Sequence, residues 1–338
     1  MHNQTRQHFN GFLARIAELN GVDNATERFS VTPNAEQKLV EKIQDTHPFL
    51  KAINHEMVDH LEGEKIYVGT NTTIAGRTDT TGTAEREPNA VHSLSNDKYR
   101  CEQTNQDTYI RYATLDAWRH DPAFQQHLRN ATSKQIGRDH LMIAFNGTSA
   151  AANTNRVANP LLQDVNIGLL ERLRRGKASA VISAMKIGDH AGADYRNPDA
   201  AVFDAVNELI EPWNRGDDLV VLCGRKVVAD KYFTMLNGND VPSERSALEG
   251  MLLKKALGTL PTITVPFFPE NAFMITPLKN LSKYTQRGTT RLNYLDNPKR
   301  DRIEEYRSVN ECFVIEDYDA CCMFEGILQY NEVTSTWE

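Results

Sequence analysis

The sequence lacks the long apolar runs of a membrane protein and the leader of a secreted one. No stretch of about 18 consecutive apolar residues occurs, and Met1–Arg6 is polar, with no apolar segment and small-residue cleavage site behind it. We therefore expect neither a membrane span nor a membrane partner.

Cysteine is scarce and odd in number. The five residues are Cys101, Cys223, Cys312, Cys321 and Cys322. A disulfide framework needs paired cysteines at higher density in a protein that leaves the reducing cytosol, so we expect free thiols. The neighbours Cys321 and Cys322 have no second Cys or His pair at metal-ligand spacing, and we interpret them as small buried hydrophobic residues.

Positive charge is also in short supply. The formal net charge is −7 and the sequence pI is about 5.8. The local basic stretches Arg172–Arg175 and Lys299–Arg302 are isolated clusters of the kind that usually form solvated surface. Because a protein that grips nucleic acid needs clustered Lys and Arg, the composition excludes a dedicated nucleic-acid clamp.

Catalytic and metal-binding motifs are missing as well. His55 and His60 resemble the HExxH zinc helix, but they stand five residues apart instead of four and on a helix would point about 140° apart. Ser149 lacks the flanking glycines of a nucleophile elbow, and Gly224 lacks the rest of a phosphate-binding loop. The sequence predicts no catalytic residue, metal or cofactor. The competing interpretation is a cytosolic enzyme with scattered site residues such as Asp139, His140 and Asp230.

What is present is a chain that can fold. Its 338 residues, 40% hydrophobic and 25% charged, correspond to one or two packed units. Apolar residues at helical spacing predict a helix over Thr5–Asn20, followed by a polar linker at Asp23–Arg28. A second helix should begin at Thr32-Pro33 and end near His47-Pro48, since proline suits a first turn and restrains the residue before it.

A polar stretch from Gly69 to about Asn96 interrupts the packed pattern. It holds almost no apolar residues, so it cannot bury itself, and such long loops are usually functional or disordered. Short strands flank it at Lys65–Val68 and Tyr109–Tyr112. We predict a long hairpin that becomes ordered against a partner surface.

The rest of the chain mixes helices and strands. A helix of about 25 residues should run from Asp121-Pro122 to Asn146-Gly147, long enough to span the subunit. The remaining predicted helices are 162–174, 197–212, one after Gly224, and 246–257, and the remaining strands are 219–223, 263–265, 272–275, 284–286 and 310–316. Since these elements do not repeat as βαβ units, the predicted fold class is α+β.

Taken as whole phrases, the sequence resembles the major capsid proteins of P2-like (peduovirus) tailed bacteriophages. The matching segments run in order over nearly the whole chain, and departures lie in the polar loop and around Met185–Ala193. The segments are Arg15–Gly21, Gly63–Ile66, Tyr109–Tyr112, Thr114–Asp116, Phe145–Gly147, Asn159–Pro160, Leu162–Val165, Leu209–Trp213, Ala229–Phe233, Glu304–Tyr306 and Val314–Tyr318.

The resemblance implies the Hong Kong 97-type capsid fold. Its parts would be an N-terminal scaffold-interacting segment at 1–29, an N-arm at 30–60, an extended β-hairpin loop with its stems at 61–108, a peripheral domain with a spine helix at 109–189, an axial domain at 190–285, and a return to the peripheral domain at 286–338. The same resemblance implies a non-enzymatic shell subunit that assembles in the host cytoplasm into hexamers and pentamers of the virion. Its further partners would be a scaffolding and maturation protease, a portal protein and non-specifically contacted double-stranded DNA.

Relatives of this kind lose an N-terminal piece on maturation. The matching boundary here lies at Phe29-Ser30, directly after the polar linker. We expect the Phe9–Leu19 helix to dock on the scaffold before the chain is cut. A phage tail or connector protein, which would form a tube or a single ring, is the other assembly protein considered.

Overall fold

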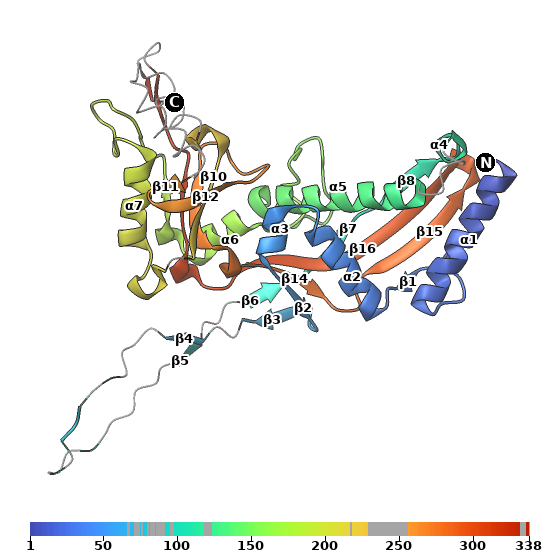
Figure 1. Cartoon of the computed structure of the whole chain (residues 1–338), viewed down its shortest axis with the longest axis horizontal. Coiled ribbons are helices and arrows are strands. Elements are labelled where there is room, and N and C mark those ends of the chain that lie inside the picture. Colours follow the sequence, from blue (N-terminus) through green and yellow to red (C-terminus); the bar gives the residue numbers. More distant parts are fainter. Residues whose placement is uncertain are drawn as a thin grey trace, which may run out of the picture.

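A long body with a thin hairpin projecting from it makes up the subunit (Figure 1). The computed structural model describes residues 1–65, 68–70, 75, 77–79, 81, 85, 92–94, 98–117, 124–216, 218–228, 256–331 and 336–337. No helix of this described part is both long and apolar enough to cross a membrane.

A seven-stranded sheet forms one half of the body around β16 (Arg302–Ile315), a strand of 14 residues. The strand order is β1-β15-β16-β14-β2, and β7 and β8 also pair with β16. The other strands are β1 (Phe29–Ser30), β2 (Asn54–Val58), β7 (Glu102–Asn105), β8 (Thr108–Arg111), β14 (Leu281–Gln286) and β15 (Arg291–Asn297). The first half of β16 pairs with β8 and β15, and its second half pairs with β14, with β7 between.

A six-stranded sheet forms the other half of the body. Its order is β11-β12-β10-β13-β17-β9, from the strands β9 (Val181–Ser183), β10 (Leu219–Cys223), β11 (Ala256–Leu257), β12 (Leu260–Thr264), β13 (Phe273–Pro277) and β17 (Cys322–Glu325). β10 and β13 are almost wholly buried, as their continuous apolar sequences require. A small pair, β18 (Tyr330–Asn331) and β19 (Thr336–Trp337), lies near the C-terminus.

The helices follow the apolar spacing of their sequences. They are α1 (Asn3–Asn20), α2 (Pro33–Gln44), α3 (Pro48–Ala52), α4 (Tyr112–Ala117), α5 (Phe124–Asn146), α6 (Leu169–Gly176) and α7 (Pro198–Leu209). α5 runs along the long axis beside β16, α7 covers the six-stranded sheet, and α1 lies at the opposite end (Figure 1). One large core joins the six-stranded sheet to α3, α6, α7 and the last turns of α5.

Several predicted elements match the structure, and the predicted α+β class is confirmed. α2 begins at Pro33, and α7 begins at Pro198, where the Asn197 side chain accepts a hydrogen bond from the Ala200 N–H at 2.8 Å. The predicted start of the long helix at Asp121-Pro122 and most of the predicted 246–257 helix lie outside the described residues; Ala256–Leu257 is a strand.

The predicted helix over 162–174 was wrong in its start. Leu162 has a positive φ of 59° in a turn, and the helix α6 begins only at Leu169. Gly168 lies so close to α5 that an added Cβ would be 2.2 Å from the Ile143 carbonyl oxygen. Position 168, directly before α6, therefore has no room for a side chain.

Candidate assembly surfaces

The polar stretch leaves the body as a two-stranded hairpin. β3 (Glu62–Glu64) pairs with β6 (Lys98–Arg100), and farther out β4 (Val68–Thr70) pairs with β5 (His92–Leu94), both antiparallel. Figure 1 shows β4 and β5 well away from the body. An isolated two-stranded ribbon is only marginally stable in water, so the hairpin would be stabilised by packing against a partner surface.

The base of the hairpin is tied to the body by aromatic packing. The rings of Tyr99 and Tyr284 meet edge to face with centroids 5.1 Å apart. A Cβ at Gly63 would lie 2.6 Å from the Tyr99 ring, so glycine is required for this packing. On the same side, Lys65 donates to the Ile315 carbonyl and lies 4.8 Å from the centre of the Tyr318 ring.

The N-terminal helix α1 packs on the outer part of the seven-stranded sheet. Ile16 and Ala17 are buried in a small cluster with Leu292 and Tyr294 of β15. The Phe12 ring meets the Tyr294 ring edge to face at 5.4 Å. The helix is thus docked on its own subunit through an apolar contact separate from the main core.

Polar contacts hold the start of α1. The Thr5 hydroxyl donates to Asp116 at 2.7 Å, and the backbone N–H of His2 donates to the same carboxylate at 2.9 Å. Arg6 forms an ion pair with Asp296. These hydrogen bonds lower the pKa of Asp116 below its usual value, so the contacts are present at neutral pH.

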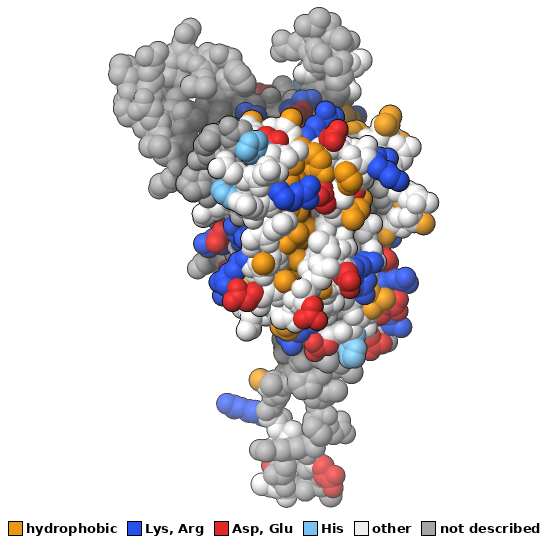
Figure 2. All heavy atoms as spheres, turned by 90° about the vertical axis from the view of Figure 1, so that its right-hand side faces the viewer, with side chains coloured by type: hydrophobic (Ala, Val, Ile, Leu, Met, Phe, Trp, Pro, Cys, Tyr) orange, Lys and Arg blue, Asp and Glu red, His pale blue; other side chains and the backbone are white. Residues whose placement is uncertain are grey.

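An apolar strip remains exposed at this end of the molecule. Figure 2 shows apolar side chains gathered in the middle of the face, flanked by charged ones. On α1, Phe9 and Leu13 are half-buried and Leu19 is 52% exposed. The helix therefore keeps apolar surface that its own subunit does not cover.

The sequence-predicted cleavage residues lie in the short edge strand β1. Phe29 is buried and pairs with Leu292, whereas Ser30 is exposed and pairs with Arg291. Val31 continues this contact, since its N–H donates to the Thr290 carbonyl at 2.9 Å. A protease would have to detach β1 from β15 before it could bind this segment.

Exposed apolar side chains also mark the open face of the seven-stranded sheet. Tyr109 and Leu295 both lie opposite Glu304, on either side of β16, so their side chains share a face. Tyr306, two residues further along β16, points the same way. Tyr109 is 55% exposed, and Leu295 and Tyr306 are each 43% exposed. In the other half of the body, Phe203 and Trp213 are exposed.

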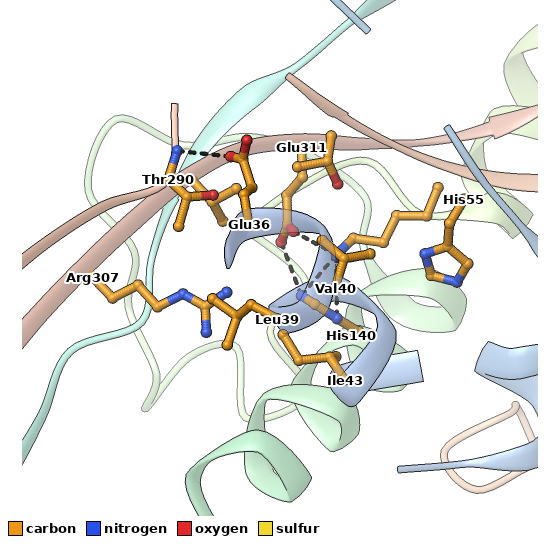
Figure 3. Close-up of a pocket in the computed structure, with 12 residues that line it drawn as sticks. Glu36, Leu39, Val40, Ile43, His55, His140, Thr290, Arg307 and Glu311 are labelled. Carbon is orange, nitrogen blue, oxygen red and sulfur yellow. Dashed lines mark hydrogen bonds and ion pairs between the residues drawn. The ribbon is translucent and has the colours of Figure 1, made fainter. Parts of the chain in front are cut away.

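A buried charged cluster joins the N-terminal region to the sheet (Figure 3). Lys283 Nζ lies 2.6 Å and His140 Nε2 3.2 Å from the Glu311 carboxylate. Glu36 of α2 accepts hydrogen bonds from the backbone N–H groups of Gly288 and Thr290 at 3.0 and 3.2 Å. The cluster surrounds a space of only about 10 Å³, enough for one water molecule and no substrate.

Burial and opposite charges set the protonation states of the cluster. Burial lowers the pKa of His55 to about 4, so this imidazole is neutral at pH 7, and burial also lowers the pKa of His140. Burial raises the pKa of Glu311, but the neighbouring His140 and Lys283 outweigh it and hold the carboxyl well below its usual range. Such a network stabilises one arrangement of α2, α5, β2, β14 and β16.

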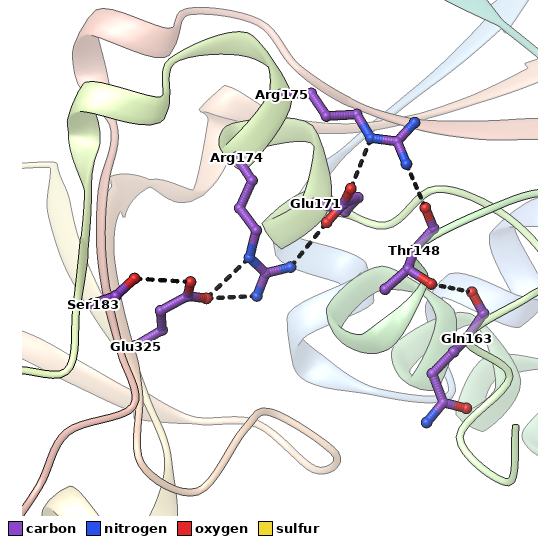
Figure 4. Close-up of polar contacts among 7 residues, drawn as sticks. All are labelled: Thr148, Gln163, Glu171, Arg174, Arg175, Ser183 and Glu325. Carbon is purple, nitrogen blue, oxygen red and sulfur yellow. Dashed lines mark hydrogen bonds and ion pairs between the residues drawn. The ribbon is translucent and has the colours of Figure 1, made fainter.

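A second polar network lies where the two halves of the body meet (Figure 4). Arg174 of α6 donates two hydrogen bonds to one oxygen of Glu325 in β17, at 3.0 and 2.6 Å. Arg175 donates to Glu171 at 2.7 Å and to the carbonyl of Thr148, just after α5, at 2.6 Å. α6 thus connects the long helix to the six-stranded sheet.

Of the residues considered for an enzyme, the structure describes Asp139 and His140. Asp139 accepts a hydrogen bond from Gln135, and its neighbour His140 is buried in the charged cluster. His55 lies on strand β2, not on the helix that the zinc comparison assumed. Asp230 lies outside the described residues. Within the described ranges, no group of three His, Cys, Asp or Glu side chains is placed to hold a metal ion.

The sequence was compared with known families and proteins. Residues 8–327 match the family model described as phage major capsid protein, P2 family. A capsid protein of Escherichia phage P2 is 42% identical, over 97% of this chain and 95% of that protein. The major capsid protein of Serratia phage KSP20 is 36% identical, over 97% of both chains.

Solved structures give the same result at the level of the fold. A chain of the satellite phage P4 procapsid, a structure that includes the size determination (Sid) protein, superposes with a TM-score of 0.80 at 38% identity, over 97% of this chain and 99% of that one. A capsid chain of an empty GTA particle superposes with a TM-score of 0.55 at 13% identity, over 83% and 90% of the two chains, which shows a shared fold alone. The predicted Hong Kong 97-type capsid fold is confirmed.

Proposed function

The chain belongs to the P2 family of phage major capsid proteins, and from this premise we propose how it assembles. It is a structural component of the phage virion. In the proposal, subunits form closed hexamers and pentamers that build an icosahedral head around double-stranded DNA, and assembly takes place in the host cytoplasm. Each contact between subunits can be weak, because a closed shell holds every subunit at high effective concentration.

The observation that carries the proposal is the projecting hairpin. Its outer strands β4 and β5 pair only with each other in the described part of the chain. We propose that each hairpin lies over a neighbouring subunit and that the exposed Tyr109, Leu295 and Tyr306 form its receiving surface. Three large apolar or aromatic side chains on an open sheet face are typical of a protein contact.

The same proposal divides the chain by role. Residues 1–29 bind scaffold and are removed, 30–60 form the N-arm, 61–108 the extended loop, 109–189 and 286–338 the peripheral domain, and 190–285 the axial domain. Support for a separate role of the first segment comes from the small apolar cluster that it forms with β15, apart from the main core, and from the partly uncovered apolar side chains of α1.

Cleavage at Phe29-Ser30 makes maturation of the shell irreversible. In the proposal, α1 binds the scaffolding protease during assembly, β1 then detaches from the sheet edge, and the chain is cut. Loss of α1 removes affinity that was needed only for assembly. The modest negative charge suits non-specific contact with packaged DNA, and a portal protein occupies one vertex.

No enzymatic role is part of the proposal. The buried charged cluster of His140, Lys283 and Glu311 surrounds a space for one water molecule, so it suits a structural role.

The test is co-expression of the chain with the scaffolding protease of its phage. Electron microscopy should show closed shells, and mass spectrometry should show subunits that begin near Ser30. Subunits that begin at Met1 in mature shells would overturn the processing step alone. A monodisperse monomer or a single ring under every assembly condition would overturn the shell.

A further inference from the structure

Cys101 and Cys312 lie side by side although 211 residues separate them in the chain. Their sulfur atoms are 3.5 Å apart. β7 and β16 are antiparallel with Glu102 opposite Glu311, so the next position of the same register places Cys101 opposite Cys312. The N–H of Cys101 donates to the Leu61 carbonyl at 2.9 Å and not across to β16.

This arrangement suits a covalent bond between the two sulfurs. Directly opposed residues of a non-hydrogen-bonded antiparallel pair have Cα atoms about 4.5 Å apart. A disulfide spans Cα atoms about 4.4 to 6.8 Å apart. The register therefore places Cys101 and Cys312 at a spacing that a disulfide can span.

The pair also stands at a mechanical joint. Cys101 connects β6, which belongs to the hairpin stem, to β7, which belongs to the body sheet. Both cysteines are buried with Tyr99 and Tyr284 in the small cluster at the hairpin base. A bond here would connect the hairpin directly to the central strand β16.

We propose that Cys101 and Cys312 form an intramolecular disulfide when the particle meets an oxidising medium outside the cell, and that this bond fixes the base of the hairpin on the body. The expectation that the protein meets an oxidising medium rests on the proposed capsid function. Formation of the disulfide does not depend on shell assembly, because both cysteines belong to one subunit.

The oxidant is a small-molecule disulfide. The Cys101 thiolate attacks one of its sulfurs and releases one small thiolate; Cys312 then attacks the mixed disulfide at Cys101 and releases the second. The protein gives up two electrons and two protons, and the oxidant becomes two thiols. A hydrogen bond from Cys312 lowers the pKa of Cys101, which favours Cys101 as the first nucleophile. Because both sulfurs are buried, the reaction waits for local opening of the joint.

The test uses oxidised glutathione on the full chain, both as free subunits and as assembled shells. Thiols are counted after denaturation, and proteolytic fragments are identified by mass spectrometry. We expect loss of two of the five thiols and a linked pair of fragments that contain Cys101 and Cys312. Five remaining thiols after prolonged exposure, or a bond that involves Cys321 or Cys322, would overturn the proposal.

A functional measurement accompanies the chemical one. After oxidation, proteolysis of the hairpin stem should slow in the wild type and return to its original rate with a reductant. Cys312→Ser should lose this difference, while Cys223→Ser, another buried cysteine, should keep it. An equal response of both variants would contradict the assignment. Because free subunits are tested too, the disulfide proposal can be judged even if no shells assemble.

Discussion

Lys283 and Glu311 form an ion pair inside the protein, with Nζ and carboxylate oxygen 2.6 Å apart and side chains 5% and 2% exposed. They lie on the neighbouring strands β14 and β16, beneath α2 and α5. A charge in such a place is tolerated only when its partner is present. The packing of α2 and α5 against this part of the sheet therefore depends on the ion pair.

Removal of one partner should be strongly destabilising. Lys283→Met leaves the Glu311 carboxylate buried without its cation, and we expect unfolding free energy to fall by about 3–5 kcal/mol. The double variant Lys283→Met, Glu311→Leu should lose less than the single one. Urea denaturation of the free subunit measures both. Lys51→Met, which breaks an exposed ion pair with Asp45, is the control and should change stability far less, because water screens an exposed pair. A single variant as stable as that control would refute the coupling.

Stability should fall as the pH drops from 6.5 to 4, in part because of His55. Its pKa is about 4 in the folded protein and 6.5 when unfolded, so the unfolded chain binds a proton first. The stability is full above pH 6.5 and decreases until the folded protein also binds the proton. Between pH 7 and 4.5, His55→Gln should lose about 2–3 kcal/mol less than the wild type, from urea titrations at each pH. Parallel pH profiles for the two proteins would exclude His55 as a source.

Much of the fold could be predicted from local patterns, and the rest depended on distant partners. The helices that begin at Pro33 and Pro198 were predictable because proline and a capping residue act within a few positions. The length of β16 was missed because Glu304 and Arg307 interrupt its apolar pattern, although the folded sheet buries both. In the sequence alone, charged residues at these two positions indicate an exposed segment and not a buried strand.

The charged cluster could not be predicted for the same reason. His140, Lys283 and Glu311 are 143 and 28 positions apart along the chain and share no motif. A weak signal was available, since Lys283 and Glu311 are charged residues within otherwise strand-like segments. The hairpin, by contrast, was predictable because a stretch with almost no apolar residues cannot form a core of its own.

The open sheet face should matter for assembly and not for folding. Leu295→Ser removes a side chain that is 43% exposed, so the free subunit should stay folded and lose only about 1–2 kcal/mol of stability. If the hairpin of a neighbour binds there, the yield of shells should fall several-fold, as counted by sedimentation and electron microscopy. Val157→Ser, on a side chain 93% exposed in a loop, is the matched control and should assemble normally. Normal assembly of Leu295→Ser would remove this residue from the proposed receiving surface.

The hairpin base offers the most selective test, because two glycines of the chain differ in their surroundings. Gly63→Ala would place a Cβ 2.6 Å from the Tyr99 ring, whereas Gly11→Ala on α1 meets nothing within 4 Å. The first substitution should displace Tyr99 from Tyr284 and destabilise the subunit by about 1–3 kcal/mol. The second should leave stability unchanged or raise it by up to about 1 kcal/mol, since alanine favours a helix interior.

Thermal denaturation measures the stability of both variants, and hydrogen exchange at residues 98–105 reports on the hairpin base itself. Because the hairpin needs a fixed base to reach a neighbour, Gly63→Ala should also lower shell yield. Unchanged exchange in Gly63→Ala would show that the Tyr99 packing does not hold the hairpin.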